Sequence, residues 1–189
     1  DDYYDNLAHG KTEDWVDVYI HAKFGKSLSG QPVFRSFDRS NHVAGEELKP
    51  MFNDAPLLIG IDAGLTPAAV IGELVYDGRL VVYEAITSDG MGALRFVRER
   101  LKPLLTNKFP GRRALVIIDP AAFQRVQTDE RTVADIYKNE GFVLKPARTN
   151  SIAARIAAVE KFLTRVVDGK FGLVVDPNSG SQLVKALAG

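Results

Sequence analysis

Two short apolar runs, each followed directly by an aspartate, constrain the fold of this chain more than any other feature. The first run covers residues 57–61 and precedes Asp62, and the second covers residues 114–118 and precedes Asp119. Both are rich in β-branched residues and almost free of polar ones, which is typical of central strands covered on both faces. If the two strands are parallel neighbours, they bring both carboxylates to the sheet edge where ligands of open α/β sheets bind.

The proximity of two carboxylates has a chemical consequence. They repel each other unless a proton or a cation lies between them, and a hard divalent cation with oxygen ligands is the natural occupant. The alternative for each residue is an Asp that closes a turn through its own side chain. Five apolar residues precede Asp119, and a second strand-end acid is present at Asp62. Because an unpaired charge emerging from the interior is costly, a shared metal site is the favoured interpretation.

The composition excludes several classes of protein. The 189 residues suffice for one domain with a substantial core, and they include no cysteine, which excludes disulfides, zinc–thiolate sites and thiol nucleophiles. The sequence has no apolar stretch of membrane-span length and no signal peptide pattern, so we expect a cytoplasmic protein without membrane contact. It also lacks a glycine-rich Walker loop, which argues against ATP binding of that kind.

The net charge of zero hides an asymmetry between the two halves. Residues 1–100 hold 10 Lys/Arg and 16 Asp/Glu, whereas residues 101–189 hold 14 and 8. A basic half suits a polyanion, because Lys and Arg neutralise phosphates and release counterions. The alternative is a solvated surface whose charges cancel in three dimensions.

The hydrophobic pattern becomes regular from residue 57. Asp77 and Gly78 form a hairpin turn between the second and third strands, after which helices and strands alternate. The expected strands are 57–62, 68–76, 79–86, 114–119, 142–145 and 173–175. The expected helices are 94–104, 132–139, 150–168 and a last one that starts at Ser179 or Ser181 and runs to 189. This order predicts an α/β, ribonuclease H-like mixed sheet flanked by helices. In that arrangement the first strand is central and the fourth lies beside it.

Residues 1–50 differ from this regular pattern. An amphipathic helix is expected from Thr12 to about Gly25, followed by a loop. Val33, Phe34 and Phe37 are expected to pack onto another part of the protein. We therefore predict a linker from an upstream domain at 1–50 and the domain proper at 51–189. All three histidines lie in the linker, so the sequence offers no His–carboxylate dyad for the aspartates.

Other acidic residues near strand ends are weaker candidates. Glu84 and Asp89 follow the third strand and would reach a metal ion only through water, so a solvent-facing or capping role is favoured. Asp176 precedes Pro177 after a late strand, and we interpret it as a turn residue.

A basic and polar segment lies at the start of the helix expected from residue 150. Arg148, Asn150 and Arg155 suit the phosphate backbone of DNA, because a helix N-terminus and Arg side chains both bind phosphate. The alternative, a helix cap beside an exposed Arg, is equally compatible with the pattern.

Several short motifs follow one another in a specific order. They are Glu13-Asp14-Trp15-Val16, Gly30-Gln31-Pro32-Val33, Phe37-Asp38, Gly60-Ile61-Asp62-Ala63-Gly64-Leu65, Asp119-Pro120-Ala121, Asn150, Arg155-Ile156, Val159-Glu160, Asp176-Pro177 and Leu187-Ala188-Gly189. Together they span nearly the whole chain. In this order and spacing the chain resembles the C-terminal nuclease domain of the large terminase subunit of tailed bacteriophages and prophages, preceded by the linker from its ATPase domain.

The resemblance implies an endonuclease that cuts concatemeric double-stranded viral DNA during genome packaging in the host bacterial cytoplasm. It implies partners as well: the DNA, the upstream ATPase domain, the portal and the small terminase subunit. In the family, three carboxylates hold two Mg²⁺ or Mn²⁺ ions. One ion generates hydroxide and the other stabilises the leaving 3′ oxygen. Asp62, bridging both ions, and Asp119 match the first two acids.

The third acid of the family lies in a His-x-x-Asp-Ala type segment, which has no match in residues 1–189. We therefore expect a domain truncated at its C-terminus, with impaired activity as an isolated fragment. Two other functions remain as alternatives. One is a non-catalytic module that docks portal or small terminase. The other is an actin-like ATPase lobe, which also carries Gly-Ile-Asp-x-Gly on its first strand.

Overall fold

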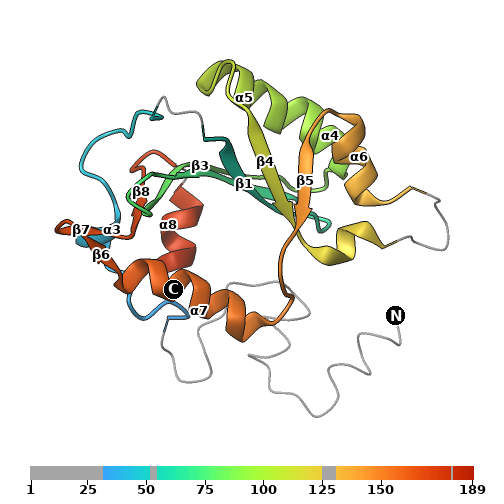
Figure 1. Cartoon of the computed structure of the whole chain (residues 1–189). Coiled ribbons are helices and arrows are strands. Elements are labelled where there is room, and N and C mark those ends of the chain that lie inside the picture. The colour runs from blue at the N-terminus through green and yellow to red at the C-terminus, as the bar shows by residue number, and fades with distance from the viewer. Residues whose placement is uncertain (1–31, 52–54, 125–130, 180) are drawn as a thin grey trace, which may run out of the picture.

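A six-stranded mixed sheet forms the centre of the molecule (Figure 1). The structure is a computed structural model that describes residues 32–51, 55–124, 131–179 and 181–189. In sheet order the strands are β5 (Val143–Pro146), β4 (Ala114–Ile118), β1 (Leu57–Asp62), β2 (Ala68–Leu74), β3 (Leu80–Thr87) and β8 (Leu173–Val175). Strand β2 is antiparallel to its two neighbours, and the other strands are mutually parallel. The predicted α/β mixed sheet is confirmed, with β1 central and β4 beside it.

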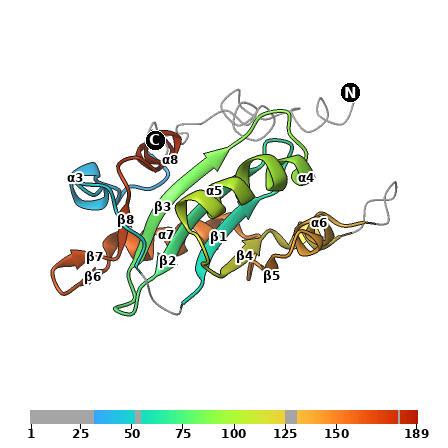
Figure 2. The same cartoon turned by 90° about the horizontal axis from the view of Figure 1, so that it is seen from above.

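Helices cover both faces of this sheet. One face carries α4 (Ala93–Phe96), the π-helical turn η1 (Val97–Leu101), α5 (Lys102–Lys108) and α6 (Val133–Asn139), and the other carries α7 (Ile152–Thr164) and α8 (Ser181–Ala188) (Figure 1). Seen from above, α4 and α5 lie over β1 and β2 (Figure 2). Among the described residues, none of the helices is long and apolar enough to cross a membrane.

The main core lies under α4 and α5. Leu57, Ile59 and Ile61 alternate along β1 and are buried in this core together with Phe96 and Leu101. Because side chains alternate between the two faces of a strand, the intervening residues of β1 point to the opposite face. The apolar run of β1 thus contributes residues to two faces of the sheet, one buried and one more open.

The π-helical turn joins α4 and α5 into one continuous helix from residue 93 to 108. It ends two residues before Pro103, whose ring clashes with the carbonyl four residues earlier in a regular α-helix and which has no N–H to donate. The wider π-turn accommodates the proline without ending the helix. The sequence pattern predicted this helix from Leu94 to Leu104 but gave no indication of its π-turn.

The hairpin between β2 and β3 follows the predicted turn. Gly78 adopts φ 82°, the left-handed region that glycine enters at little cost. The N–H of Gly78 donates to the Val75 carbonyl at 2.8 Å, and Asp77 accepts from the N–H of Arg79 at 2.9 Å. Because β2 runs antiparallel to β1, this turn lies at the end of the sheet where β1 begins, away from Asp62.

A second, smaller core lies under α7 and α8. Leu163, Val184 and Leu187 pack there against Val82 of β3 and Val175 of β8. These contacts lie over the β3 and β8 side of the sheet. The same face of β1 is left more open, because its residue 58 is half-buried and its residues 60 and 62 are exposed.

Helix α7 is shorter than predicted. The sequence pattern suggested a helix that continued through Val166 to Gly169, but α7 ends at Thr164. Residues Val166–Val167 (β6) instead pair antiparallel with Lys170–Phe171 (β7) around a tight turn at Asp168 and Gly169, both with positive φ. Val166 is 56% exposed, so no packing against the core favours a helical conformation at this residue.

The described part of the predicted linker packs against the domain. Phe34 and Phe37 contact the second core, as predicted. The same prediction is wrong for Val33, which is 45% exposed. The short helix α3 (Arg39–His42) is capped by Asp38, and it buries His42, which hydrogen-bonds the Leu163 carbonyl at 2.9 Å. The helix expected at residues 12–25 lies outside the described ranges. The division at residue 50 stays a prediction.

A buried carboxylate lies at the opposite end of the sheet from Asp62. Glu73 of β2 is fully buried, accepts a 2.5 Å hydrogen bond from the Tyr83 hydroxyl and forms an ion pair with Arg112. The Arg112 guanidinium also donates to the carbonyls of Met51 at 2.6 Å and Ala55 at 3.0 Å. The cluster thereby attaches the segment before β1 to the sheet. Burial, together with the bond to Glu73, raises the pKa of Tyr83 well above its ordinary value.

Candidate functional site

Strand register places the two predicted aspartates side by side. Ile61 of β1 is the parallel partner of Ile118 of β4. Asp62 is the next and last residue of β1, and Asp119 directly follows β4. Neighbouring strands lie about 4.8 Å apart, so the two carboxylates leave adjacent backbones at the same level. Both lie on the face opposite the buried isoleucines, which is the more open face of β1.

A groove of about 310 Å³ runs along this face beside the two carboxylates. Its polar lining residues come from the ends of β1 and β4 and from the start of α7 with the residue before its cap. It is lined by Gly60, Ile61, Asp62, Ala68, Val70, Ile117, Ile118, Asp119, Ala147, Asn150 and Arg155. The structure thus brings together four of the five predicted site residues.

Each aspartate also closes its own turn. One oxygen of Asp62 accepts from the N–H of Gly64 at 3.2 Å, and one oxygen of Asp119 accepts from the N–H of Ala121 at 2.7 Å. The turn role that the sequence left open is therefore real for one oxygen of each residue. A carboxylate has two oxygens and about four acceptor sites, so this role does not compete with binding a cation.

Arg155 and Asn150 line the groove together with the carboxylates. Ser151 caps α7 by accepting from the N–H of Ala154 at 3.4 Å, so Asn150 is not needed as the cap. Arg155 lies in the first turn of α7 and is exposed. Arg148 is also exposed but does not line the groove, so this one predicted residue lies apart from the others.

The charges in the groove have no salt-bridge partners within the described residues. None of the ion pairs there involves Asp62, Asp119 or Arg155. Glu84, in contrast, is partly buried and pairs with Lys108 at 3.0 Å, so the solvent-facing or capping role favoured from the sequence is wrong. The groove therefore holds two negative charges and one positive charge that are available to a ligand.

The interior beneath the site contains a tyrosine. Tyr137 of α6 is fully buried, and its hydroxyl has no hydrogen-bond partner among the described residues. Burial, together with the negative charge of Asp62, raises the pKa of Tyr137 to about 12. Helix α6 packs against the 3₁₀ turn η2 (Pro120–Phe123), which directly follows Asp119. Tyr137 therefore remains protonated near the carboxylates at neutral pH.

The remaining acidic candidates lie apart from the groove. Asp89 is exposed in the loop after β3. Asp176 is fully buried after β8, on the far edge of the sheet, and accepts from the N–H groups of Asn178 at 2.7 Å and Leu48 at 2.6 Å. It is the turn residue that the sequence indicated, and it also anchors the segment before β1.

The donor set of the groove is compatible with Mg²⁺ or Mn²⁺. No group of three or more His, Cys, Asp or Glu side chains suited to a metal ion occurs in the described ranges. Mg²⁺ is nevertheless commonly bound by one or two carboxylates, with water and substrate phosphate oxygens completing its shell. Asp62 and Asp119 fit that pattern, because each keeps an oxygen that its own turn does not use.

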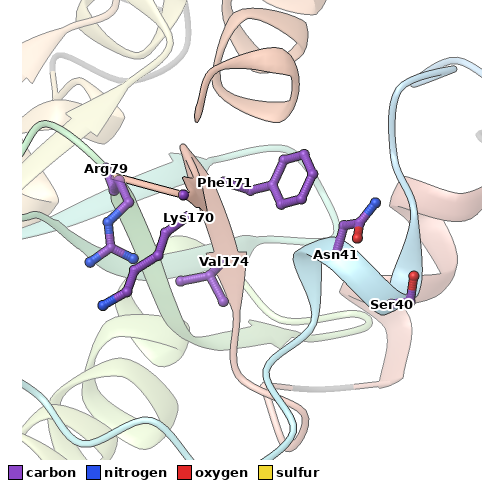
Figure 3. Close-up of a pocket in the computed structure, with 7 residues that line it drawn as sticks. Ser40, Asn41, Arg79, Lys170, Phe171 and Val174 are labelled. Atoms are coloured by element: carbon purple, nitrogen blue, oxygen red, sulfur yellow. The ribbon is translucent and has the colours of Figure 1, made fainter. Parts of the chain in front are cut away.

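A second cavity, of about 320 Å³, lies near the β2–β3 hairpin (Figure 3). Arg79 and Lys170 line one side of it, and Ser40 and Asn41 of α3 line the other (Figure 3). Arg79 is already paired with Asp77 at 2.7 Å. The cavity contains no acidic lining residue and lies at the opposite sheet edge, so it is separate from the carboxylate groove.

Sequence reasoning missed the apolar floor of the groove. Ala68, Val70 and Ile117 were assigned only to strands, and nothing in their identity distinguishes them from core residues. The period of two along each strand offered a signal: the residues two positions from Asp62 and Asp119 share their face. Only the register between β1, β2 and β4 shows that these residues meet.

Solved structures of large terminases share this fold. The chain is similar to the large terminase from a thermophilic bacteriophage in two crystal forms, with TM-scores of 0.61 and 0.59 and identities of 14% and 16%. The alignments cover 98% and 97% of this chain but only 43% and 45% of the thermophilic phage chains, so the chain spans less than half of that protein.

A further solved structure narrows the likeness to one domain. The P22 large terminase nuclease domain matches with a TM-score of 0.52 and 11% identity, over 78% of this chain and 73% of that domain. No protein-family model and no curated protein matches the sequence. The resemblance indicated by the motifs is confirmed at the level of structure. The chain therefore has an α/β, ribonuclease H-like fold similar to that of a large terminase nuclease domain.

Proposed function

We propose that this chain is the nuclease domain of a large terminase, a metal-dependent endonuclease that cuts double-stranded concatemeric viral DNA during genome packaging. The observation that supports the proposal most directly is the groove on the open face of β1. It combines adjacent Asp62 and Asp119 with Arg155 and Asn150, on a fold shared with large terminases. Carboxylates that hold a cation and an Arg that binds phosphate are groups that suit metal-assisted phosphodiester hydrolysis.

Each side chain has a distinct role in this proposal. Asp62 and Asp119 hold Mg²⁺ or Mn²⁺ through the oxygens that their turns do not use. When bound, the cation supplies Lewis acidity toward the phosphate and acidifies a water molecule. Arg155 and Asn150 hold phosphate oxygens across the groove. Such contacts position the DNA without reading its bases, which suits cutting that is not directed by base sequence.

The partners follow from the likeness to large terminases. We propose that the upstream ATPase domain belongs to the same polypeptide, that portal and small terminase are further partners, and that the enzyme acts in the host bacterial cytoplasm. The third carboxylate is proposed to lie beyond residue 189. A two-metal mechanism then requires the longer polypeptide, whereas a single cation needs only Asp62 and Asp119.

Nicking of supercoiled plasmid in Mn²⁺ tests the proposal. Both the 189-residue chain and a form extended at its C-terminus are assayed, and the extended form is expected to be the more active. Asp62→Asn and Asp119→Asn should each lower the rate at least about 100-fold, because several kcal/mol of cation-dependent stabilisation is lost at about 1.4 kcal/mol per factor of ten. Asp89→Asn, an exposed acid on the same sheet edge, is the matched control and should cut normally.

Two results would contradict the proposal. If Asp62→Asn cuts as fast as the unmodified extended chain, the carboxylates are not the metal site. If no form cuts DNA but the chain binds portal or small terminase, it is a docking module. Hydrolysis of ATP without DNA cleavage would instead support the actin-like lobe.

A further inference from the structure

A gap in a row of side chains marks the floor of the groove. Across the three central strands, Gly60 of β1 lies between Val70 of β2 and Ile117 of β4. Both neighbours carry β-branched side chains, whereas Gly60 carries none and is exposed. A Cβ atom added at Gly60 would meet no other atom within 4 Å. The row therefore has a notch one side chain wide that opens into the groove.

The backbone does not require glycine at this position. Gly60 is not among the glycines with positive φ, and it lies inside a regular ladder that pairs with both neighbouring strands. A glycine inside a strand weakens it and is a common sign that a ligand or another backbone approaches closely. Since no described protein atom outside residues 59–61 lies within 4 Å of the position that a Cβ of Gly60 would take, the notch is best explained by a ligand.

The surroundings of the notch are polar at one end and apolar at the other. Along β1, residues on one face are spaced by about 6.6 Å, which places Asp62 on one side of the notch and Leu58 on the other. Asp119 lies at the Asp62 end, and Arg155 also lines the groove. With a cation held by Asp62 and Asp119, as the proposed function requires, a ligand that fits this arrangement has an anionic end beside an uncharged one.

The size of the groove limits the ligand further. Its volume of about 310 Å³ lies at the lower end of ordinary ligand pockets, which begin at about 300 Å³. A pocket of that volume accepts a fragment such as one nucleotide of a strand, while the rest of a DNA duplex stays outside.

We propose that the notch at Gly60 seats the deoxyribose of the nucleotide next to the scissile phosphate, with that phosphate at the Asp62–Asp119 end. This inference rests on the proposed nuclease function and deepens it, because it assigns the substrate contact that follows the metal site along the groove. The apolar floor of Val70, Gly60 and Ile117 excludes water from the sugar, and the strand enters the groove lengthwise along β1.

Gly60→Val tests this assignment, because it fills the notch with a side chain that suits a strand. Gly45→Val is the matched control: Gly45 also has open space for a Cβ and no positive φ, but it lies in the segment before β1. Binding of thymidine 5′-monophosphate and of inorganic phosphate is measured calorimetrically on the full chain in Mn²⁺. Thermal unfolding checks that each variant folds.

The expected result separates the sugar from the phosphate. Gly60→Val should weaken the nucleotide at least about tenfold, the scale on which pockets discriminate small groups, and change inorganic phosphate by less than about twofold. Gly45→Val should change neither. If Gly60→Val leaves nucleotide affinity intact, or weakens both probes equally, the notch does not seat the sugar. If the unmodified chain binds no Mn²⁺ and neither probe, the proposed nuclease function itself fails.

Discussion

Two clusters of charged groups, at opposite ends of the same sheet, use carboxylates in opposite ways. At the carboxyl end of β1, Asp62 and Asp119 lie on an open face and no ion pair with a described residue neutralises them. At the other end, Glu73 is fully buried and is surrounded by Arg112 and the Tyr83 hydroxyl. The first pair is ready for a ligand, and the second is already satisfied by the protein.

This difference assigns the two clusters to different properties of the protein, namely stability and activity. A satisfied buried ion pair contributes little beyond a well-packed apolar cluster, but it becomes costly when one partner is removed. Asp62 and Asp119 have no ion-pair partner among the described residues, so they contribute less to folding and keep an oxygen for a cation. We therefore expect stability to depend on the Glu73 cluster and activity to depend on the groove.

The largest expected effect on stability is at Glu73. Glu73→Ala removes the carboxylate from a buried guanidinium, and breaking such a pair costs about 3–5 kcal/mol. Asp62→Ala, an acid-to-alanine change on the exposed end of β1, should alter the free energy of unfolding by no more than about 0.5 kcal/mol. Urea denaturation of both variants measures the contrast.

A second variant distinguishes the ion pair from simple loss of volume. Replacing Glu73 and Arg112 together with methionine should restore much of the stability lost in Glu73→Ala, because neither charge is then buried alone. If Glu73→Ala costs no more than Asp62→Ala, the two clusters do not differ in the way described.

Metal binding provides the next largest effect, and it applies only to the groove. Mn²⁺ at about 100 times its Kd should raise the free energy of unfolding by about 2.7 kcal/mol, since it binds the folded state alone. For a chain of this size that corresponds to a rise in Tm of about 5–10 °C. The rise should disappear in the Asp62→Asn/Asp119→Asn double variant and persist in Asp89→Asn. An equal rise in the double variant would place the Mn²⁺ elsewhere.

Much of the fold could be predicted from the sequence because its signals are local. The predicted positions of the central strands and most helices lie close to the observed ones. The signals behind them were the apolar runs, the Asp77–Gly78 turn and Gly141. The end of α7 could not be predicted in this way. Val166 continues the helical spacing of apolar residues, but pairing between β6 and β7 determines the local structure there.

The candidate site could be predicted only as far as the order of the strands in the sheet could be predicted. Asp62 and Asp119 meet because two local patterns became parallel neighbours, and Asn150 and Arg155 meet them because α7 begins beside that edge. The notch at Gly60 depends on the register of three strands, which no single segment specifies. The Glu73–Arg112 pair joins residues 39 positions apart and has no local signature at all.

The smallest expected effect concerns Tyr137, which connects the two kinds of environment because it is buried like Glu73 but lies beneath Asp62. Its hydroxyl has no described partner, so Tyr137→Phe should change the free energy of unfolding by less than about 1 kcal/mol at pH 8, in favour of the variant.

The sign of the alkaline effect follows from the pKa. Because the pKa of Tyr137 is about 12 in the folded chain and 10.0 ordinarily, the folded state keeps a proton that the unfolded state loses. The associated stability is complete below pH 10 and declines as the pH rises toward 12. Urea denaturation at pH 8 and pH 11 should therefore show the advantage of Tyr137→Phe growing with pH. Tyr76→Phe is the control, since that ring is 91% exposed. If the stability difference between Tyr137→Phe and the unmodified chain does not change with pH, the Tyr137 hydroxyl reaches water. The interior around Tyr137 is then less enclosed than the Glu73 cluster.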